Sequence, residues 1–186
     1  KTPQFSYSRL KGANPVAHVE MASTGEVACL GSGFLEAFFA SWTATEQRLE
    51  GKRVLVSIGG SDKVKLLPEL KILDKLGYEL YTTPGTHDFL SKHGIATRCL
   101  FKASAKRTPN VIDVIQERKV DFIINIPSSE VPSQTVTDGY QIRRLAIDHH
   151  IPLVTNLQIA ASFLRCLIQP KEIEIKSWQS YVENKL

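Results

Sequence analysis

Tyr81-Thr82-Thr83-Pro84-Gly85-Thr86-His87 joins an apolar run that begins at Tyr78 to a short amphipathic stretch. Gly85 tolerates a positive φ and Pro84 fixes its own φ near the helical value, so a tight strand-to-helix turn is predicted. We expect Thr86 to cap the helix that follows, which leaves backbone N–H groups and hydroxyls at one point. Such a helix N-terminus attracts anions through its unpaired donors and its dipole. The turn therefore predicts a site for the phosphate or carboxylate of a small effector, and an ordinary β-to-α turn is the simpler alternative for the heptapeptide alone.

Strand and helix patterns alternate regularly on both sides of this turn. Leucines spaced from Leu66 to Leu76 predict a helix that stops at Gly77. The run 120–126 is apolar throughout, as expected of a central parallel strand that is buried on both faces. The predicted strands are 54–58, 78–81, 95–101, 120–126 and 151–154, and the predicted helices are 66–76, 89–93, a segment capped by Asn110, 140–150 and 157–168.

This alternation across short loops predicts an α/β fold. We expect a Rossmann-like three-layer sandwich, with a mainly parallel sheet of about five strands and helices on both faces. Residues 1–30 lack a helical period and predict an irregular N-terminal extension, whereas 34–42 carry an apolar helical stripe. The polar stretch 43–52 predicts a linker, and a last helical segment is expected from about Lys171. Because the chain starts at Lys1 and not at Met, we expect it to be a fragment of a longer protein.

Composition narrows the class of protein. The 186 residues are 42% hydrophobic and 23% charged, as in an ordinary soluble globular domain. A net charge of +4 without a basic, aromatic-rich run permits phosphorylated ligands but does not favour nucleic acid. Cys29, Cys99 and Cys166 are far apart and form no metal-binding pattern, which favours a reducing compartment, such as the cytosol, and no metal site. No run approaches the roughly 20 apolar residues of a membrane span, so no membrane partner is expected.

Polar residues follow the ends of the predicted strands. In parallel α/β sheets, ligands bind in the crevice at the carboxyl ends of the strands. We therefore expect the polar residues that follow the five strands to converge on one site. They are Ser57 to Lys63, Thr83 to Thr86, Lys102, Asn125 to Ser129, and Thr155-Asn156.

The side chains at these ends are suited to an anion. Lys63 and Lys102 would supply point charges that balance the two negative charges of a phosphate, although most single lysines are simply solvated. The hydroxyls belong to Ser57, Thr83 and Thr86, each of which could instead cap a helix or a turn.

The strand-four loop adds an amide and further hydroxyls. Asn125 offers donors and an acceptor to a ribose, carbonyl or amide group, or it is a satisfied amide at a strand end. Ser128 and Ser129, which follow Pro127, are weaker candidates.

Other motifs are less informative. The stretch Gly59-Gly60-Ser61-Asp62-Lys63 lacks P-loop spacing, and neighbouring His149 and His150 would point about 100° apart on a helix. Arg143-Arg144 would pair with acids of a neighbouring domain or form a solvated face. Asp62 and Asp88 are the only carboxylates offered at these strand ends, and they form no obvious proton-transfer pair. The pattern favours binding over catalysis, with no catalytic residue assigned.

Two parts of the chain resemble the large chain of carbamoyl-phosphate synthetase. Residues 5–13 and 20–27, including Glu20-Met21-Ala22-Ser23-Thr24-Gly25-Glu26-Val27, are similar to the end of its second ATP-grasp unit. From about residue 52 the chain is similar to its methylglyoxal-synthase-like allosteric domain. The matching pieces there are Leu55-Val56-Ser57, Thr83-Pro84-Gly85-Thr86, Ile123-Ile124-Asn125 and Ile142-Arg143-Arg144.

The resemblance implies two parts and a regulatory site. Residues 1–45 would be the tail of the ATP-grasp unit, and 46–186 the effector-binding domain. In bacterial relatives this domain binds the inhibitor UMP, and the matching positions here are Ser57, Lys63, Thr83, Thr86, Lys102 and Asn125, with Ser128 as a substitute for a hydroxyl lost at Pro127. Mitochondrial members activated by N-acetylglutamate have Trp in place of Lys102, so the lysine favours a phosphorylated effector. Leu153 replaces a tyrosine that contacts ornithine in some members, whereas Thr155 retains its neighbour.

The resemblance also implies a parent enzyme. That enzyme would be a cytoplasmic, glutamine-hydrolysing ligase of pyrimidine and arginine biosynthesis that uses ATP and Mg²⁺ or Mn²⁺. Its partners would be the rest of the synthetase chain and a glutaminase chain, while this fragment would need no cofactor and have no activity alone. Two alternatives remain open: a lyase of the methylglyoxal synthase type, and an oligomerisation module with an unoccupied crevice.

Overall fold

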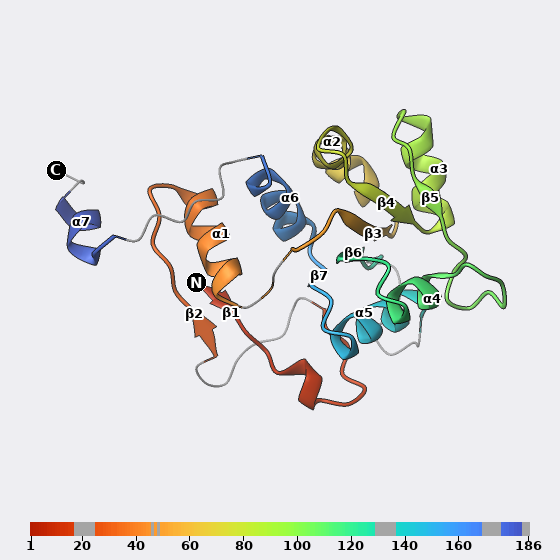
Figure 1. The fold of residues 1–186 in the computed structure, drawn as a ribbon, viewed down its shortest axis with the longest axis horizontal. Helices are drawn as coiled ribbons and strands as arrows, with labels where there is room; N and C mark the ends of the chain where they lie inside the picture. Colours follow the sequence, from red (N-terminus) through yellow and green to blue (C-terminus); the bar gives the residue numbers. More distant parts are fainter. Residues whose placement is uncertain (17–24, 46, 48, 129–136, 169–175, 184–186) are drawn as a thin grey trace.

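A five-stranded parallel sheet organises the molecule (Figure 1). The computed structural model describes residues 1–16, 25–45, 47, 49–128, 137–168 and 176–183. The strands are β3 (Arg53–Ile58), β4 (Glu79–Thr82), β5 (Arg98–Cys99), β6 (Phe122–Ile126) and β7 (Leu153–Val154). Their order is β5-β4-β3-β6-β7, so the order reverses between β3 and β6. This is the place where ligands bind in such sheets.

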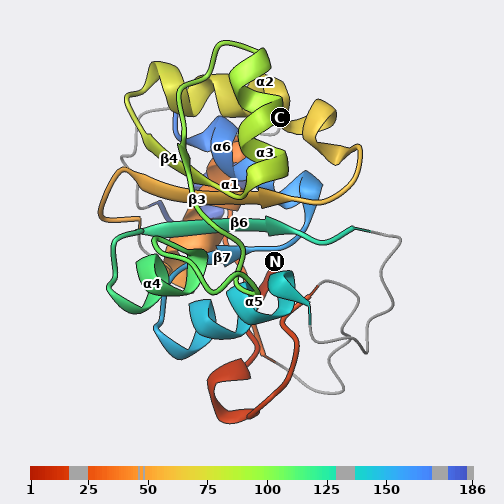
Figure 2. The same cartoon turned by 90° about the vertical axis from the view of Figure 1, so that its right-hand side faces the viewer.

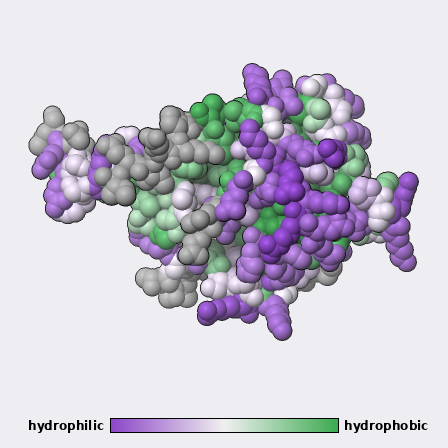
Figure 3. Space-filling model, viewed as in Figure 1, coloured by the Kyte–Doolittle hydropathy of each residue, from purple (hydrophilic) through white to green (hydrophobic). Residues whose placement is uncertain are grey.

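Helices cover both faces of the sheet, which confirms the predicted three-layer α/β architecture (Figure 2). One layer contains α2 (Asp62–Lys75), α3 (Pro84–Lys92) and α6 (Leu157–Cys166). The other contains α4 (Val111–Gln116) and α5 (Asp138–Asp148). In Figure 3 the face over the sheet is mainly hydrophilic, and hydrophobic side chains gather near α2 and α6.

The two faces of the sheet bury different sets of side chains. Phe122 and Phe163 lie in the core under α2 and α6, whereas Leu55, Ile123 and Ile142 lie in the core under α4 and α5. Residues of β3 and β6 alternate between these two cores, as expected of strands buried on both faces. Every residue of β6 is buried, in agreement with its continuous apolar sequence.

Several local signals are confirmed. Gly77 has a φ of +73° just after α2, and Asn110 caps α4 with its side chain, which accepts hydrogen bonds from the N–H groups of Ile112 and Asp113. The edge strands are shorter than predicted, because β5 pairs with β4 over two residues and β7 pairs with β6 over two residues. The helix α3 is longer than predicted, since it begins at Pro84 and not near Phe89.

The N-terminal region is irregular, as expected, but it is attached to the domain. It contains the antiparallel pair β1 (Thr2–Pro3) and β2 (Glu26–Val27), a 3-10 turn η1 (Tyr7–Arg9), and the helix α1 (Phe34–Ala44). The helix α1 packs on α6. A short helix, α7 (Trp178–Glu183), lies near the C-terminus. The division at residue 45 stays a prediction.

An ion pair joins the amino ends of β3 and β6. Arg53 donates to Asp121 through NH2 at 2.6 Å, Nε at 3.0 Å and its backbone N–H at 2.9 Å. These hydrogen bonds hold the pKa of the Asp121 carboxyl below its ordinary value. The lowered pKa means that the carboxylate stabilises the fold above the unfolded-state pKa of about 3.9, and that this stabilisation is lost as the pH falls through the folded-state pKa.

We therefore expect Asp121→Asn to lower the free energy of unfolding by about 1–2 kcal/mol at pH 7, because Arg53 is partly solvated and loses a charged acceptor. Urea unfolding at pH 7 and at pH 3 measures the effect. The difference between the two proteins should shrink at pH 3. A difference of the same size at both pH values would contradict the assignment.

Candidate functional site

Three hydroxyls meet at the carboxyl ends of β3 and β4. Thr83 Oγ1 lies 3.3 Å from Ser57 Oγ and 3.5 Å from Thr86 Oγ1. Ser57 is in β3, Thr83 directly follows β4, and Thr86 is in the first turn of α3. The predicted convergence of these three side chains is therefore present in the fold, because β3 and β4 are parallel neighbours.

The predicted cap at Thr86 is wrong. Pro84 occupies the first position of α3, where its missing N–H has no consequence, so Thr83 is the N-cap residue. Thr86 is buried, and its Oγ1 accepts a hydrogen bond from the Ile58 N–H at 3.2 Å. Thr86 thus ties the start of α3 to the end of β3 and holds the three hydroxyls together.

The start of α3 presents positive potential to this crevice. The backbone N–H groups of Thr86 and His87 bond to the Thr83 carbonyl, and Gly85 is exposed. The first turn, which the structure describes in full, carries no acidic side chain. The nine-residue helix therefore points the positive end of its dipole at the hydroxyl cluster of Ser57, Thr83 and Thr86.

Asn125 lies on the β6 side of the hydroxyl cluster. It pairs with Ser57 in the β3–β6 register, and its Nδ2 lies 3.5 Å from the Ser57 carbonyl oxygen. Asn125 is 3% exposed, and its Oδ1 accepts a hydrogen bond from Arg143 NH1 at 2.6 Å. The amide is therefore fixed between β3 and α5 at the point where the strand order reverses.

Arg143 was not predicted as a site residue. We expected it to face acids of another domain or solvent, but it is 3% exposed and contacts the side-chain oxygens of Asn125 and Asn14. Burial lowers the pKa of its guanidinium. One signal in the sequence was its position three residues before Ala146, which is buried on the same helix.

Arg144 differs from the prediction as well. It pairs with Asp148 of its own helix and donates through NH1 to the carbonyls of Tyr7, Leu10 and Ala13. The two arginines thus contact the N-terminal region and not solvent alone.

The two predicted lysines lie in the segments that follow the carboxyl ends of β3 and β5. Lys63 is half-buried in the first turn of α2, and its Nζ donates to the Gly60 carbonyl at 3.0 Å. Lys102 is exposed and follows β5, just after Leu100, whose N–H donates to the Thr82 carbonyl at 2.8 Å. That both lysines hold one ligand together with the hydroxyls stays a prediction.

The loop that carries Lys102 runs from β5 to α4 and contacts the start of α5 on the way. Both oxygens of Asp138, in the first turn of α5, accept hydrogen bonds from Ser104, from its N–H at 2.7 Å and its hydroxyl at 3.2 Å. In Figure 2 this green segment descends in front of β3 and β6 towards α4.

Ser128 lies beside the turn that follows β3. A Cβ atom at Gly59 would lie 2.6 Å from the Ser128 backbone nitrogen, so only glycine fits there without a shift of the chain. Ser129 lies outside the described residues. Thr155, and Leu153 in the place of the family tyrosine, line a groove of about 1390 Å³ between β7, α1 and the first eight residues. This groove is separate from the hydroxyl crevice, since it is lined by none of Ser57, Thr83 and Asn125.

Metal-binding and membrane-spanning features do not occur in the described part of the chain. No three or more of its His, Cys, Asp or Glu side chains form a cluster that could hold a metal. His149 follows α5 as its C-cap residue, as predicted for a helix end. Of the helices that the structure describes, none has the length and apolar character to cross a bilayer.

Comparison with known proteins identifies the fold family. A family profile described as the MGS-like domain matches residues 65–155, which run from α2 to just after β7. Residues 65–155 belong to the MGS-like domain family. This region contains the α3 start, Asn125 and Arg143.

The relatives include large proteins of which this chain matches a small part. Multifunctional protein URA2 of Saccharomyces cerevisiae is 42% identical over 176 residues, which cover 90% of this chain and 8% of that protein. Multifunctional protein pyr-3 of Neurospora crassa is 39% identical over 183 residues, with 94% and 10% covered. The mitochondrial carbamoyl-phosphate synthase (ammonia) of Homo sapiens is 33% identical over 185 residues, with 97% and 12% covered. The chain therefore spans about a tenth of the length of the curated relatives it matches, and it corresponds to a carbamoyl-phosphate synthase region.

Proposed function

We propose that this MGS-like domain is the allosteric domain of a carbamoyl-phosphate synthase and that its crevice binds the phosphate of a nucleotide such as UMP. The observation that carries the proposal is the cluster of the Ser57, Thr83 and Thr86 hydroxyls at the start of α3. Hydroxyls and a helix N-terminus together suit a phosphate, which accepts several hydrogen bonds and is negatively charged.

The surrounding groups complete the proposed site. Lys63 and Lys102 would balance the charge of the phosphate, and the Asn125 amide would contact the ribose or another oxygen of the nucleotide. Ser128, beside the Gly59 turn, would close the side near β6. In this arrangement the phosphate lies at the α3 end of the crevice and the nucleoside extends towards α5.

The parent protein is part of the proposal. It would be a cytoplasmic ATP-dependent ligase that uses Mg²⁺ or Mn²⁺ and receives ammonia from a glutaminase chain, and it would serve pyrimidine and arginine biosynthesis. The names of the relatives support the synthase and the pyrimidine pathway. Regulation requires that the effector bind one conformation of the parent more tightly, typically by about 1–3 kcal/mol.

Calorimetric titration of the chain with UMP, UTP and IMP tests the proposal directly. We expect UMP to bind and Lys102→Ala to weaken it about tenfold, the effect of losing one charge-assisted contact. Lys106→Ala is the matched control, because Lys106 is an exposed lysine of the same loop. Equal UMP affinity of Lys102→Ala and the unmodified chain would contradict the assignment of Lys102.

Two other outcomes distinguish the alternatives. Release of methylglyoxal and phosphate from dihydroxyacetone phosphate would identify a lyase, for which a positioned acid and base are needed. Of the two carboxylates at the strand ends, Asp62 is paired with Lys65 and Asp88 is exposed on α3, so we expect no turnover. A change of oligomeric state without nucleotide binding, measured by light scattering, would instead identify an oligomerisation module.

A further inference from the structure

Among the described residues, Arg143 is a buried cation without an anionic partner. Its side chain lies between α5 and the sheet, and no carboxylate of the described residues is within ion-pairing distance of it. Burial of a charge is costly, so the hydrogen bonds that a buried guanidinium makes hold its partners firmly in place. Its described hydrogen bonds go to two neutral oxygens, Asn125 Oδ1 at 2.6 Å and Asn14 Oδ1 at 2.8 Å.

The first of these bonds determines which way the Asn125 amide faces. A guanidinium has donors only, so the Asn125 atom that it contacts must be the carbonyl oxygen. The Asn125 NH2 group is then turned towards β3, where it lies 3.5 Å from the Ser57 carbonyl. Close packing maintains this arrangement, since a Cβ at Gly139 would lie 3.0 Å from Arg143 NH1 and 3.4 Å from Asn125 Oδ1.

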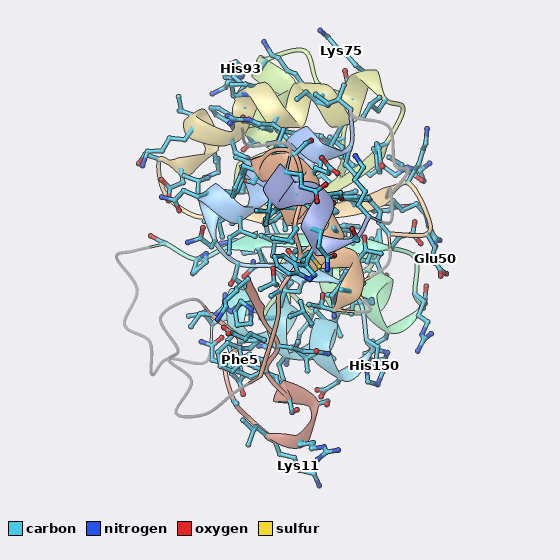
Figure 4. The ribbon with its side chains drawn as sticks, turned by 90° about the vertical axis from the view of Figure 1, so that its left-hand side faces the viewer. Phe5, Lys11, Glu50, Lys75, His93 and His150 are labelled. Atoms are coloured by element: carbon cyan, nitrogen blue, oxygen red, sulfur yellow. The ribbon has the colours of Figure 1, made fainter. Side chains whose placement is uncertain are left out.

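The second bond reaches the N-terminal region. Asn14 belongs to a segment, residues 7–14, that lies along α5. Three side chains of α5 donate hydrogen bonds to this segment. Tyr140 donates its hydroxyl to the Gly12 carbonyl at 2.9 Å, Arg143 contacts Asn14, and Arg144 donates to three carbonyls of the segment. Figure 4 shows Lys11 at the outer end of this part of the chain.

We propose that Arg143 is a positioning residue that orients the Asn125 amide in the effector crevice and, through the same guanidinium, tethers residues 7–14 to that crevice. The proposal rests on the proposed function for the identity of the ligand. It extends that function by naming the contact that joins the crevice to the N-terminal segment. One rigid, planar group carries both bonds, so a displacement of Asn125 changes the geometry at Asn14. The Asn125 NH2 group would meet an acceptor oxygen of the effector.

Hydrogen exchange without any ligand tests the tether. The reporter amides are those of Leu10 and Ala13, which donate within the segment at 3.0 and 3.2 Å. Asn125→Ala removes the acceptor from Arg143, and we expect these amides to exchange about fivefold faster, the effect of one lost hydrogen bond. Asn125→Asp keeps an acceptor for Arg143 and should not accelerate their exchange. Ser57→Ala, which alters the crevice without touching Arg143, is the control and should also leave it unchanged.

Unchanged exchange in Asn125→Ala, or equal acceleration in Ser57→Ala, would overturn the tether whether or not a nucleotide binds.

The orientation of the amide is tested by titration with UMP. Asn125→Asp retains an acceptor for Arg143 but replaces the NH2 donors by a negatively charged oxygen, so we expect it to remain folded and to bind UMP at least tenfold more weakly. Undiminished UMP binding by Asn125→Asp would overturn the orientation. Failure of UMP to bind the unmodified chain would count against the proposed function, whereas the tether would still stand or fall with the exchange rates of Leu10 and Ala13.

Discussion

Trp42→Ala is expected to lower the free energy of unfolding by about 3–5 kcal/mol, the usual cost of removing a buried aromatic side chain. Trp42 extends from α1 into the core beneath α6, where its ring centroid is 4.5 Å from that of Phe163 and 6.2 Å from that of Phe122. Truncation would leave a cavity between these rings. Urea unfolding followed by circular dichroism measures the loss.

Trp178→Ala is the matched control. Trp178 lies in α7 and is 63% exposed, so its removal should change the stability by no more than about 0.5 kcal/mol. A comparably small effect of Trp42→Ala would mean that α1 is dispensable for the core. The result also bears on the predicted division at residue 45, because Trp42 lies on the N-terminal side of that boundary.

Arg165→Ala is expected to lower the free energy of unfolding by about 2–3 kcal/mol, because it leaves the carboxylate of Glu69 buried and unpaired. Glu69 Oε1 accepts from Arg165 Nε at 2.9 Å and from NH2 at 2.6 Å, and the Glu69 side chain is only 4% exposed. Within the described part of the chain, Glu69 Oε2 has no hydrogen-bond partner. The expected loss is below the about 3–5 kcal/mol of fully buried pairs, since Arg165 is itself 58% exposed and water can reach its place.

A double variant distinguishes the loss of the ion pair itself from the cost of leaving the Glu69 carboxylate buried and unpaired. Glu69→Met combined with Arg165→Met should be close to the unmodified chain in stability, because apolar side chains of similar size replace the pair between α2 and α6. Arg165→Lys should be intermediate, since a lysine keeps the charge but not the two-nitrogen contact. If Arg165→Ala and the double variant were equally unstable, the effect would come from packing and not from Glu69.

The layered fold was predictable because its signals are local. A continuous apolar run such as β6, a glycine at the end of α2 and an asparagine before α4 each act through the conformation of a few neighbouring residues. The edge strands β5 and β7 were predicted too long, since their length depends on how many residues the neighbouring strand leaves available for pairing.

The candidate site was predictable only in part. Parallel strands bring their carboxyl ends together, which is why Ser57 and Thr83 could be placed side by side before the fold was known. The role of Thr86 could not be predicted in this way, because its hydroxyl bonds to the N–H of a residue 28 positions away. Arg143 was missed for the same reason, as the two asparagines that surround it lie 18 and 129 positions away in the chain.

The central pairing of β3 with β6 has a consequence for the order in which the chain folds. Ser57 and Asn125, which face each other in this register, are separated by 68 positions, whereas the neighbouring pair β3–β4 closes over a much shorter loop. Contacts between distant positions form late, because the entropy of the intervening chain must first be lost. During synthesis, β3 to β5 would leave the ribosome and associate first, and the half of the molecule that contains β6 and α5 would complete the sheet afterwards.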